Sequence, residues 1–312
     1  MKIGFFTEGN YQGKIPRNHP NMRVDVSWIC ALDAVHHPFQ HLPSMKDNEY
    51  DFGIVIIPKK RKYLLEVDFI GQLKRVCNKI AVMQESYYNY WQDDPIQEQI
   101  WYYNFIMEVD LILCHNEPDL KYYRGITNKR CEIMPTTMIT DYVKTSDVKT
   151  DSAIIGGNFV SAYGGFDSYM VAREVTDNIW APTTGRMKEE ERGMDINHID
   201  WVSWLDWMYE LSKHKYGVQL GTAAAGSFNL NCAYLGIPCI GYNNVNTQVK
   251  CHTDLSVDVG DIQTAKVLIN KLKNDRDFYG ECSVNSIKNY KKCFDENIYI
   301  YNMRKIMEEV IS

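Results

Sequence analysis

The sequence predicts an α/β protein with two doubly wound parallel-sheet domains. Short apolar runs alternate with stretches of helical spacing, which is the order of a parallel sheet covered by helices on both faces. A polar stretch at 141–152 interrupts this alternation, which then begins again. Because 312 residues exceed the usual size of one domain, we expect two domains that face each other across a cleft.

The expected domain boundaries follow from that polar stretch. The first domain is predicted to span 1–145 and the second domain 146–285. The remaining stretch, 286–312, has helical spacing and is expected to form C-terminal helices that pack back on the first domain.

In the first half of the chain, the predicted strands are short apolar runs. The run KIGFFT ends at Glu8-Gly9, and FGIVIIP ends at Pro58, whose nitrogen cannot donate to a strand ladder. The predicted strands lie at 2–7, 52–58, 79–86, 110–115 and 131–135. The predicted helices lie at 25–34, 66–77, 96–108 and 117–125.

The second half of the chain repeats this pattern. The predicted strands lie at 152–157, 178–183, 216–221 and 238–242. The predicted helices lie at 165–175, at 202–214, from about Ser227, at 261–275 and in two further segments near the end. The helix from Ser227 is expected to end at Gly236, because glycine commonly follows the last helical residue.

Composition and charge exclude several classes of protein. The apolar share is 45%, and no stretch reaches the roughly 18–20 uninterrupted apolar residues of a membrane span, so a folded cytoplasmic protein without a membrane partner is expected. Nine cysteines without a CxxC pair indicate reduced, buried thiols, and no metal site is expected. A net charge of −6 argues against a protein that coats nucleic acid non-specifically.

Three carboxylates in the first domain are candidates for the catalytic base. Ligands of open parallel sheets bind at the carboxyl ends of the strands. Asp25 opens a helix after the long loop PRNHPNMRV, and Glu85 and Glu8 follow predicted strands. Asp25 is the first candidate to remove a proton from an acceptor hydroxyl, with Glu85 and Glu8 as rivals. An aspartate at this position is also a common helix N-cap.

A basic block and two further residues of the first domain are candidates for acceptor binding. The block comprises Lys59, Lys60, Arg61 and Lys62. It follows the strand at 52–58 and forms either an anion-binding patch or an ordinary solvated loop. Arg23 lies in the loop before Asp25, and His115 ends a strand. A histidine beside the apolar run LILC is also commonly structural.

In the second domain, glycines lie next to a predicted helix start and after a predicted strand. Gly226 and Ser227 open one helix, whose free N–H groups and dipole suit a phosphate, although a capped and tightly packed helix has the same pattern. Gly157 lies in the glycine-rich turn GGNFVSAYGG. Neither a GxGxxG fingerprint nor a P-loop occurs, which argues against a dehydrogenase or an ATPase.

Two cations and one aromatic residue of the second domain complete this part of the candidate site. Arg186 and Lys188 follow the strand at 178–183 and suit the neutralisation of a diphosphate leaving group, although GRMKEEERG also reads as charged surface. Trp201 precedes a helix and is a candidate ligand contact, whereas tryptophans in such a segment are often part of the core.

The order of these motifs resembles the GT-B class of nucleotide-sugar glycosyltransferases. The segment GTAAAGSFNLNCAYLGIPCIGY is similar to the donor segment of that class, and HIDWVSWLDWMYELSKHKYGVQLGT is similar to the stretch before it. VDLILCHNEPDLKYYRGI followed by CEIMPTTM resembles the end of the first domain. The resemblance implies two Rossmann-like domains, with the donor bound mainly by the second and the acceptor by the first.

The sequence departs from the GT-B pattern at the donor helix. Many of these enzymes carry acidic residues around it, where this chain has Ala223 and Asn231. The resemblance then implies that Asn229 and Asn231 are donor-binding residues, with Asn231 able to bind ribose hydroxyls. Arg186 and Lys188 would replace the Arg and Lys that the class commonly has in the first loop of this domain.

A narrower resemblance concerns glycosyltransferases of T-even-like bacteriophages, including an arabinosyl-transferring type. It rests on HPNMRVDVSWICALDA, MQESYYNYW and LCHNEPDLKYYRGI. It implies that the acceptor is double-stranded DNA with hydroxymethylated cytosine, with the basic block on its phosphates and a flipped base presenting its hydroxymethyl group. The acidic net charge argues against a DNA substrate.

The resemblance implies a transferase that uses a nucleoside-diphosphate sugar. The expected donor is a UDP-sugar such as UDP-arabinose or UDP-glucose, and no metal or further cofactor is expected. The expected acceptor is 5-hydroxymethylcytosine in phage DNA. The alternatives are a polysaccharide or lipopolysaccharide glycosyltransferase, a nucleotide-sugar epimerase, and an inactive GT-B binding module.

Overall fold

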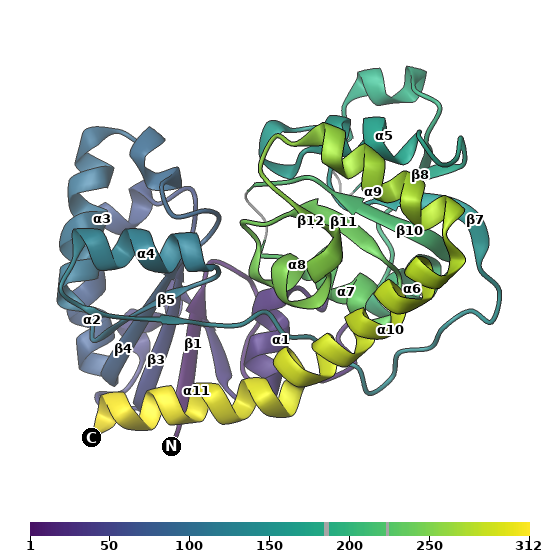
Figure 1. Ribbon diagram of the computed structural model, residues 1–312. Coiled ribbons are helices and arrows are strands. Elements are labelled where there is room, and N and C mark those ends of the chain that lie inside the picture. The colour runs from purple at the N-terminus through teal and green to yellow at the C-terminus, as the bar shows by residue number, and fades with distance from the viewer. Residues whose placement is uncertain (184–186, 223–224) are drawn as a thin grey trace. The chain divides into compact units, whose positions relative to one another are not determined.

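The computed structural model describes residues 1–183, 187–222 and 225–312 (Figure 1). They form two compact units, each with a six-stranded sheet. Unit 1 comprises Met1–Arg17, Asp25–Pro135 and Glu296–Ser312. Unit 2 comprises Asn18–Val24 and Thr136–Asp295.

This division differs from the expected boundaries at 145/146 and 285/286. Residues 136–145 belong to unit 2, where the Trp204 indole donates to the carbonyl of Ile139 at 3.1 Å. The segment Asn18–Val24 also belongs to unit 2, and the Trp204 amide donates to the carbonyl of Pro20 at 2.7 Å. Only the last helix returns to unit 1, where Arg17 forms a double ion pair with Glu296.

The sheet of unit 1 has the strand order β2-β1-β3-β4-β5-β6, and neighbouring strands pair in parallel. Its strands are β1 (Ile3–Thr7), β2 (Val35–Pro38), β3 (Tyr50–Ile57), β4 (Cys77–Gln84), β5 (Leu111–Cys114) and β6 (Arg130–Ile133). Its helices are α1 (Val24–Ala31, of which the first residue is counted with unit 2), α2 (Phe69–Val76), α3 (Ile96–Glu108), α4 (Glu117–Ile126) and α11 (Glu296–Ile311). Buried side chains such as Val55, Leu73 and Ile106 join strands and helices in one core.

The sheet of unit 2 has the order β12-β11-β10-β7-β8-β9, again with parallel neighbours. Its strands are β7 (Thr150–Ile155), β8 (Ile179–Pro182), β9 (Asn197–Ile199), β10 (His214–Gln219), β11 (Cys239–Tyr242) and β12 (Ser256–Val257). Its helices are α5 (Gly165–Ala172), α6 (Trp204–Ser212), α7 (Ser227–Tyr234), α8 (Asn246–Cys251), α9 (Ile262–Asn274) and α10 (Arg276–Cys293).

Short 3₁₀ helices connect several of these elements. They are Phe39–Ser44, Lys62–Glu66, Tyr90–Asp93, Ser161–Tyr163, Glu189–Gly193 and Thr253–Leu255. Sequence periodicity predicted none of them, because one or two tight turns carry too few residues to display a period.

Four of the regular elements have no counterpart in the sequence-based prediction. They are the strands β2, β9 and β12 and the helix α8. The strand β2 has the sequence VHHP, in which two histidines mask the apolar pattern, yet His36 is fully buried. The strands β9 and β12 have only 3 and 2 residues, which is too short for alternation to be recognised.

Each sheet has one point at which the chain changes the direction in which it adds strands. In unit 1 this point lies between β1 and β3, and in unit 2 it lies between β7 and β10. Ligands of open parallel sheets bind outside the carboxyl ends of the strands at such a point, because the flanking loops diverge there. These two strand pairs therefore locate the candidate functional loops in each unit.

Candidate functional site

In unit 2, the loops that follow β7 and β10 pack tightly against each other. The φ angle of Gly164 is +62°, and a Cβ at this position would lie 1.7 Å from the carbonyl oxygen of Leu220. The hydroxyl of Ser168 accepts from the amide of Leu220 at 2.9 Å and donates to the carbonyl of Gly164 at 2.8 Å. The amide of Thr222 donates to the carbonyl of Ala162 at 2.9 Å. Residues 156–165 and 220–222 form one structural feature, called here the unit 2 loop pair.

The packing of this loop pair accounts for its glycines. A Cβ on Gly157 would lie 2.5 Å from the carbonyl oxygen of Tyr163, and a Cβ on Gly156 would lie 2.3 Å from the ring of Phe228. Gly157 was predicted as a donor contact because glycine leaves room for a ligand. In the structure, the space that its missing side chain leaves is used by the chain's own backbone.

Gly226 and Ser227 open α7, as the sequence predicted. Gly226 is buried with a φ of +76°, and a Cβ there would lie 1.8 Å from Oγ1 of Thr247. The Thr247 hydroxyl donates to the carbonyl of Gly226 at 2.9 Å. Ser227 is half-buried at the first helical position. The first N–H groups of α7 and its dipole therefore form the positive end of a helix next to the switch point.

The two asparagines expected to bind the donor are committed to the interior of unit 2. The side chain of Asn229 is 2% exposed and donates to Oε1 of Gln248 at 2.7 Å. With its amide oriented to satisfy both ends, Asn231 donates to the carbonyl of Ser227 at 2.9 Å and accepts from the Trp207 indole at 3.0 Å. The Asn229 amide nitrogen and both ends of the Asn231 amide are thus used in packing α7, and ligand contact by these two residues stays a prediction.

The charged and aromatic candidates of unit 2 follow β8 and β9, the two strands at one end of its sheet. Lys188 is exposed after β8, and its amide donates to Oε1 of Glu191 at 2.8 Å. Trp201 is 64% exposed and follows the edge strand β9. Arg186 lies outside the described residues. A large exposed ring and an exposed ammonium are both accessible to a ligand.

The structure adds polar residues that the sequence reasoning missed. Gln219 ends β10 and donates to the carbonyl of Gly156 at 3.3 Å, and Asn158 follows β7. Both side chains are more than nine-tenths buried, and within the described ranges their carbonyl oxygens have no hydrogen-bond partner. Asn244, after β11, donates to the carbonyl of Thr222 at 2.9 Å. Their positions at strand ends were the available signal, but uncharged amides there did not stand out.

In unit 1, a buried histidine holds the loop that follows β1. His36 Nδ1 lies against the carbonyl of Tyr11, which can only accept, so Nδ1 donates and Nε2 accepts from the Thr7 hydroxyl at 2.8 Å. The Thr7 oxygen in turn accepts from the amide of Gly9 at 2.9 Å. Two backbone hydrogen bonds of 2.9 Å join His36 to Gly13. Burial lowers the pKa of His36, with the Tyr11 carbonyl and Asp25 opposing this effect, so the ring is neutral at pH 7.

A Thr7→Val variant is expected to loosen this loop and to lower the free energy of unfolding by about 1–3 kcal/mol. Valine keeps the shape of the side chain but leaves His36 Nε2 and the Gly9 amide without the Thr7 oxygen. Hydrogen exchange at Gly9 and denaturant unfolding measure both effects. Thr7→Ser keeps the hydroxyl and is the matched control, and equal exchange rates in the two variants would contradict this role of the hydroxyl.

The three carboxylate candidates differ in their surroundings. Asp25 is half-buried in the first turn of α1 and acts electrostatically on His36. Glu8 is exposed after β1, and burial together with Glu8 raises the pKa of Tyr63 to about 12. Glu85 follows β4, and its Oε2 accepts from the amide of Lys59 at 3.3 Å. Glu85 thus helps to hold the loop after β3, whereas Glu8 lies on the loop that His36 holds.

The basic block splits into one buried and three accessible residues. Arg61 is fully buried, forms an ion pair with Asp94 at 2.9 Å, donates to Gln84 at 3.0 Å and lies 4.8 Å from the ring centroid of Tyr102. Its expected role on a surface ligand is therefore corrected, because its charge is neutralised inside unit 1. The accessible residues are the half-buried Lys59 and the exposed Lys60 and Lys62.

The remaining acceptor candidates also have structural surroundings. His115 stacks on Trp28 with ring centroids 5.5 Å apart, and burial lowers its pKa to about 4. It is neutral at pH 7 and carries no charge for an anionic acceptor. Arg23 is exposed, but it lies in the segment Asn18–Val24 and hence in unit 2, not in the acceptor domain as expected.

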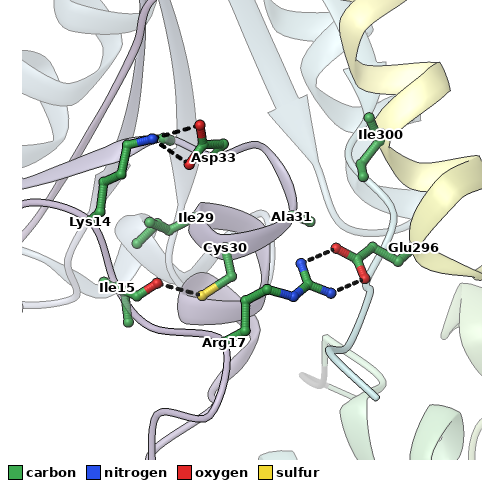
Figure 2. Close-up of a pocket in the computed structure, with 10 residues that line it drawn as sticks. Lys14, Ile15, Arg17, Ile29, Cys30, Ala31, Asp33, Glu296 and Ile300 are labelled. Carbon is green, nitrogen blue, oxygen red and sulfur yellow. Dashed lines mark hydrogen bonds and ion pairs between the residues drawn. The ribbon is translucent and has the colours of Figure 1, made fainter. Parts of the chain in front are cut away.

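A pocket of about 280 Å³ lies in unit 1 between α1 and the start of α11 (Figure 2). Its charged side chains are paired: Lys14 with Asp33 at 2.6 Å and Arg17 with Glu296 at 2.7 Å. The Cys30 thiol donates to the carbonyl of Ile15 at 3.5 Å, and burial raises its pKa to about 11, so it is a neutral thiol. The pocket does not lie at the switch point between β1 and β3.

Within 1–183, 187–222 and 225–312, no group of three His, Cys, Asp or Glu side chains is arranged to hold a metal ion. Over the same ranges, no helix has the length and apolar character that crossing a membrane requires.

Two six-stranded parallel sheets with flanking helices give this chain the GT-B fold, which is the fold of a class of nucleotide-sugar glycosyltransferases. Solved structures that share it include Anabaena HepE in complex with UDP and glucose, with a TM-score of 0.71, 9% identity and 99% of both chains covered. Sucrose-phosphate synthase from Thermosynechococcus elongatus has a TM-score of 0.74 at 9% identity, with 99% of this chain and 98% of that chain covered.

A third similar structure is α,α-trehalose 6-phosphate synthase from Burkholderia multivorans, with a TM-score of 0.64, 9% identity and coverage of 98% of this chain and 89% of that chain. No protein-family model matches the sequence, and no curated protein matches it. The GT-B resemblance of the sequence is thus confirmed at the level of the fold. The three named proteins lend no support to the narrower resemblance to phage DNA glycosyltransferases.

Proposed function

We propose that this chain is a glycosyltransferase that moves a sugar from a UDP-sugar to an acceptor hydroxyl without a metal ion. The observation that carries the proposal is the GT-B fold, which over 99% of the chain matches a protein crystallised with UDP and glucose and with UDP-glucose. A helix start and an interlocked loop pair at the switch point of unit 2 support the same assignment.

In the proposed reaction, the acceptor oxygen forms a bond to the anomeric carbon as the bond from that carbon to the diphosphate breaks. A carboxylate takes the proton of the acceptor hydroxyl, and UDP leaves with the electron pair. The first N–H groups of α7 stabilise the negative charge of the leaving diphosphate, with Lys188 and Arg186 as cations for the same group. Gly157 and Trp201 belong to the proposed donor site.

Asp25 is the proposed base, with Glu8 as the rival. Asp25 lies half-buried in the first turn of α1, at the end of the loop that leads into this helix. Glu8 is held on a loop fixed by His36 and is more exposed. Glu85 ranks below both, because its carboxylate already accepts from the Lys59 amide.

An Asp25→Asn variant is expected to lower the transfer rate by about 100-fold or more while the Kd for UDP stays unchanged. Asparagine keeps the size of the side chain but does not take up the acceptor proton. Release of UDP and the mass of the glycosylated product measure transfer, and calorimetry with UDP measures donor binding. Asp33→Asn is the control, because Asp33 is exposed with a φ of 52°, a conformation that asparagine tolerates.

The outcomes separate the rival functions. A wild-type chain that binds neither UDP nor UDP-glucose would overturn the proposal. Binding without UDP release would favour an inactive binding module, and conversion of the sugar on UDP without release would favour an epimerase. Full transfer by Asp25→Asn would leave Glu8 as the base.

Two acceptors remain as alternatives, hydroxymethylated cytosine in double-stranded DNA and a polysaccharide or lipopolysaccharide. The DNA acceptor rests on the sequence resemblance and on Lys59, Lys60 and Lys62 as phosphate contacts. Burial of Arg61 weakens it, because one of four expected positive charges is absent from the surface.

A further inference from the structure

Four tyrosines lie at the carboxyl ends of neighbouring strands of the unit 1 sheet. Tyr87, Tyr88 and Tyr90 follow β4, and Tyr122 lies on α4, which follows β5. All four residues are half-buried. They are called here the tyrosine surface. The tyrosine surface lies at the carboxyl ends of the strands, where Glu8 and Glu85 also lie. These two glutamates are the candidates for the base besides Asp25.

The rings of the tyrosine surface form two contacting pairs. Tyr88 and Tyr122 have ring centroids 4.6 Å apart, and Tyr87 and Tyr90 meet edge to face at 5.7 Å. The Tyr122 hydroxyl accepts from Nε2 of Gln92 at 2.8 Å. Because these contacts exist before a ligand binds, little side-chain freedom is lost on binding.

The backbone turns sharply between β4 and the tyrosine surface. Ser86 has a φ of +81°, a backbone conformation that residues other than glycine rarely adopt. The preceding residue is fixed by hydrogen bonds, since the Glu85 amide donates to Ile57 at 2.9 Å and the Glu85 carbonyl accepts from Gln84 at 2.7 Å. Strained conformations that the surroundings impose in this way occur often at binding sites.

The charges at this sheet edge largely cancel. The cations are Lys59, Lys60 and Lys62, and the anions are Glu8, Glu85 and Asp93. The ammonium of Lys59 lies 5.1 Å from the ring centroid of Tyr90, so the tyrosine surface covers part of the positive charge. A DNA backbone requires an excess of positive charge, which this edge lacks. A neutral ligand rich in hydroxyl groups fits the charge balance better.

We infer that the tyrosine surface binds a neutral carbohydrate and that the acceptor of the proposed transfer is a glycan. Sugar rings present C–H groups on their faces, and these pack against the negative face of an aromatic ring, while tyrosine hydroxyls donate to and accept from sugar hydroxyls. The inference rests on the proposed transferase function and adds the chemical class of the acceptor.

The test measures saccharide binding directly on the full chain saturated with UDP. Maltotriose, cellotriose and chitotriose are examined by saturation-transfer NMR, and the binding of each is titrated. At least one is expected to bind through its ring C–H protons, and Tyr90→Ala is expected to weaken that binding about tenfold. Tyr90→Phe keeps the aromatic ring and is expected to retain most of the affinity for the saccharide. Tyr301→Ala, on α11 and 67% exposed, is the matched control and should change nothing.

The same samples separate this inference from the proposed function. Calorimetry with UDP is run on every variant, and an unchanged Kd shows that the fold is intact. A wild-type chain that does not bind UDP contradicts the transferase proposal. A chain that binds UDP but none of the three saccharides, equal binding by Tyr90→Ala and wild type, or transfer only to a hydroxymethylcytosine duplex overturns the glycan inference.

Discussion

An Arg61→Ala variant is expected to lose about 3 kcal/mol or more of its free energy of unfolding, a large part of the stability of a typical domain. Arg61 is fully buried, and its removal leaves Asp94 without its ion-pair partner at 2.9 Å and Gln84 without its donor at 3.0 Å. The Asp94 side chain is 16% exposed, so water compensates part of the loss, which places the value toward the lower end for buried pairs. Urea unfolding measures the change.

Lys60→Ala is the control for Arg61→Ala, because Lys60 is exposed in the same loop. It is expected to change stability by no more than about 0.5 kcal/mol. A double variant, Arg61→Met with Asp94→Leu, should recover much of the lost stability, since it removes both charges of the pair. If Arg61→Ala unfolds at the same urea concentration as Lys60→Ala, the stabilising role assigned to Arg61 is contradicted.

A Gly164→Ala variant is expected to lose UDP binding and about 3 kcal/mol or more of stability. The left-handed backbone alone costs an alanine about 1–2 kcal/mol. The larger part arises because the new Cβ would lie 1.7 Å from the Leu220 carbonyl oxygen, so the unit 2 loop pair must separate. Calorimetry with UDP and thermal unfolding measure the two effects.

Two glycines elsewhere separate backbone strain from steric overlap. Gly260 has a φ of +87°, and a Cβ added there would have nothing within 4 Å, so Gly260→Ala is expected to cost only the conformational part, about 1–2 kcal/mol. Gly193 has open space and no positive φ, so Gly193→Ala should be neutral or stabilising by up to about 1 kcal/mol. If Gly164→Ala loses no more stability than Gly260→Ala and still binds UDP, the tight packing of the unit 2 loop pair is contradicted.

The elements that sequence periodicity predicted well are long or strongly apolar. The helix at 96–108 was expected with the bounds that α3 has, and the apolar runs at 52–58 and 110–115 became β3 and β5. A buried strand of a parallel sheet needs a continuous apolar run, so its sequence is recognisable without its partners. The strand β2 was missed because the burial of His36 depends on hydrogen bonds to Thr7 and Tyr11, which lie far from it in the sequence.

The candidate site was predicted less completely than the fold. The helix start at Gly226 and Ser227 was located from the sequence, since glycine before a helix is a local signal. The inward orientation of Asn229 and Asn231 was not predicted from the sequence, because it depends on Gln248 and Trp207, which lie on other elements. The tyrosine surface was visible in MQESYYNYW only as a string of aromatic letters.

Hydrophobic periodicity predicted the α/β class of the fold and the positions of most strand ends, because this periodicity is a local property of the chain. Which polar side chains remain accessible depends on contacts that form only when the chain folds. Arg61 and Lys60 are neighbours in one basic run, yet one is fully buried against Asp94 and the other is exposed. The free energy of a charge depends on its partners and on its distance from water, and both are set by segments that meet only in the folded protein.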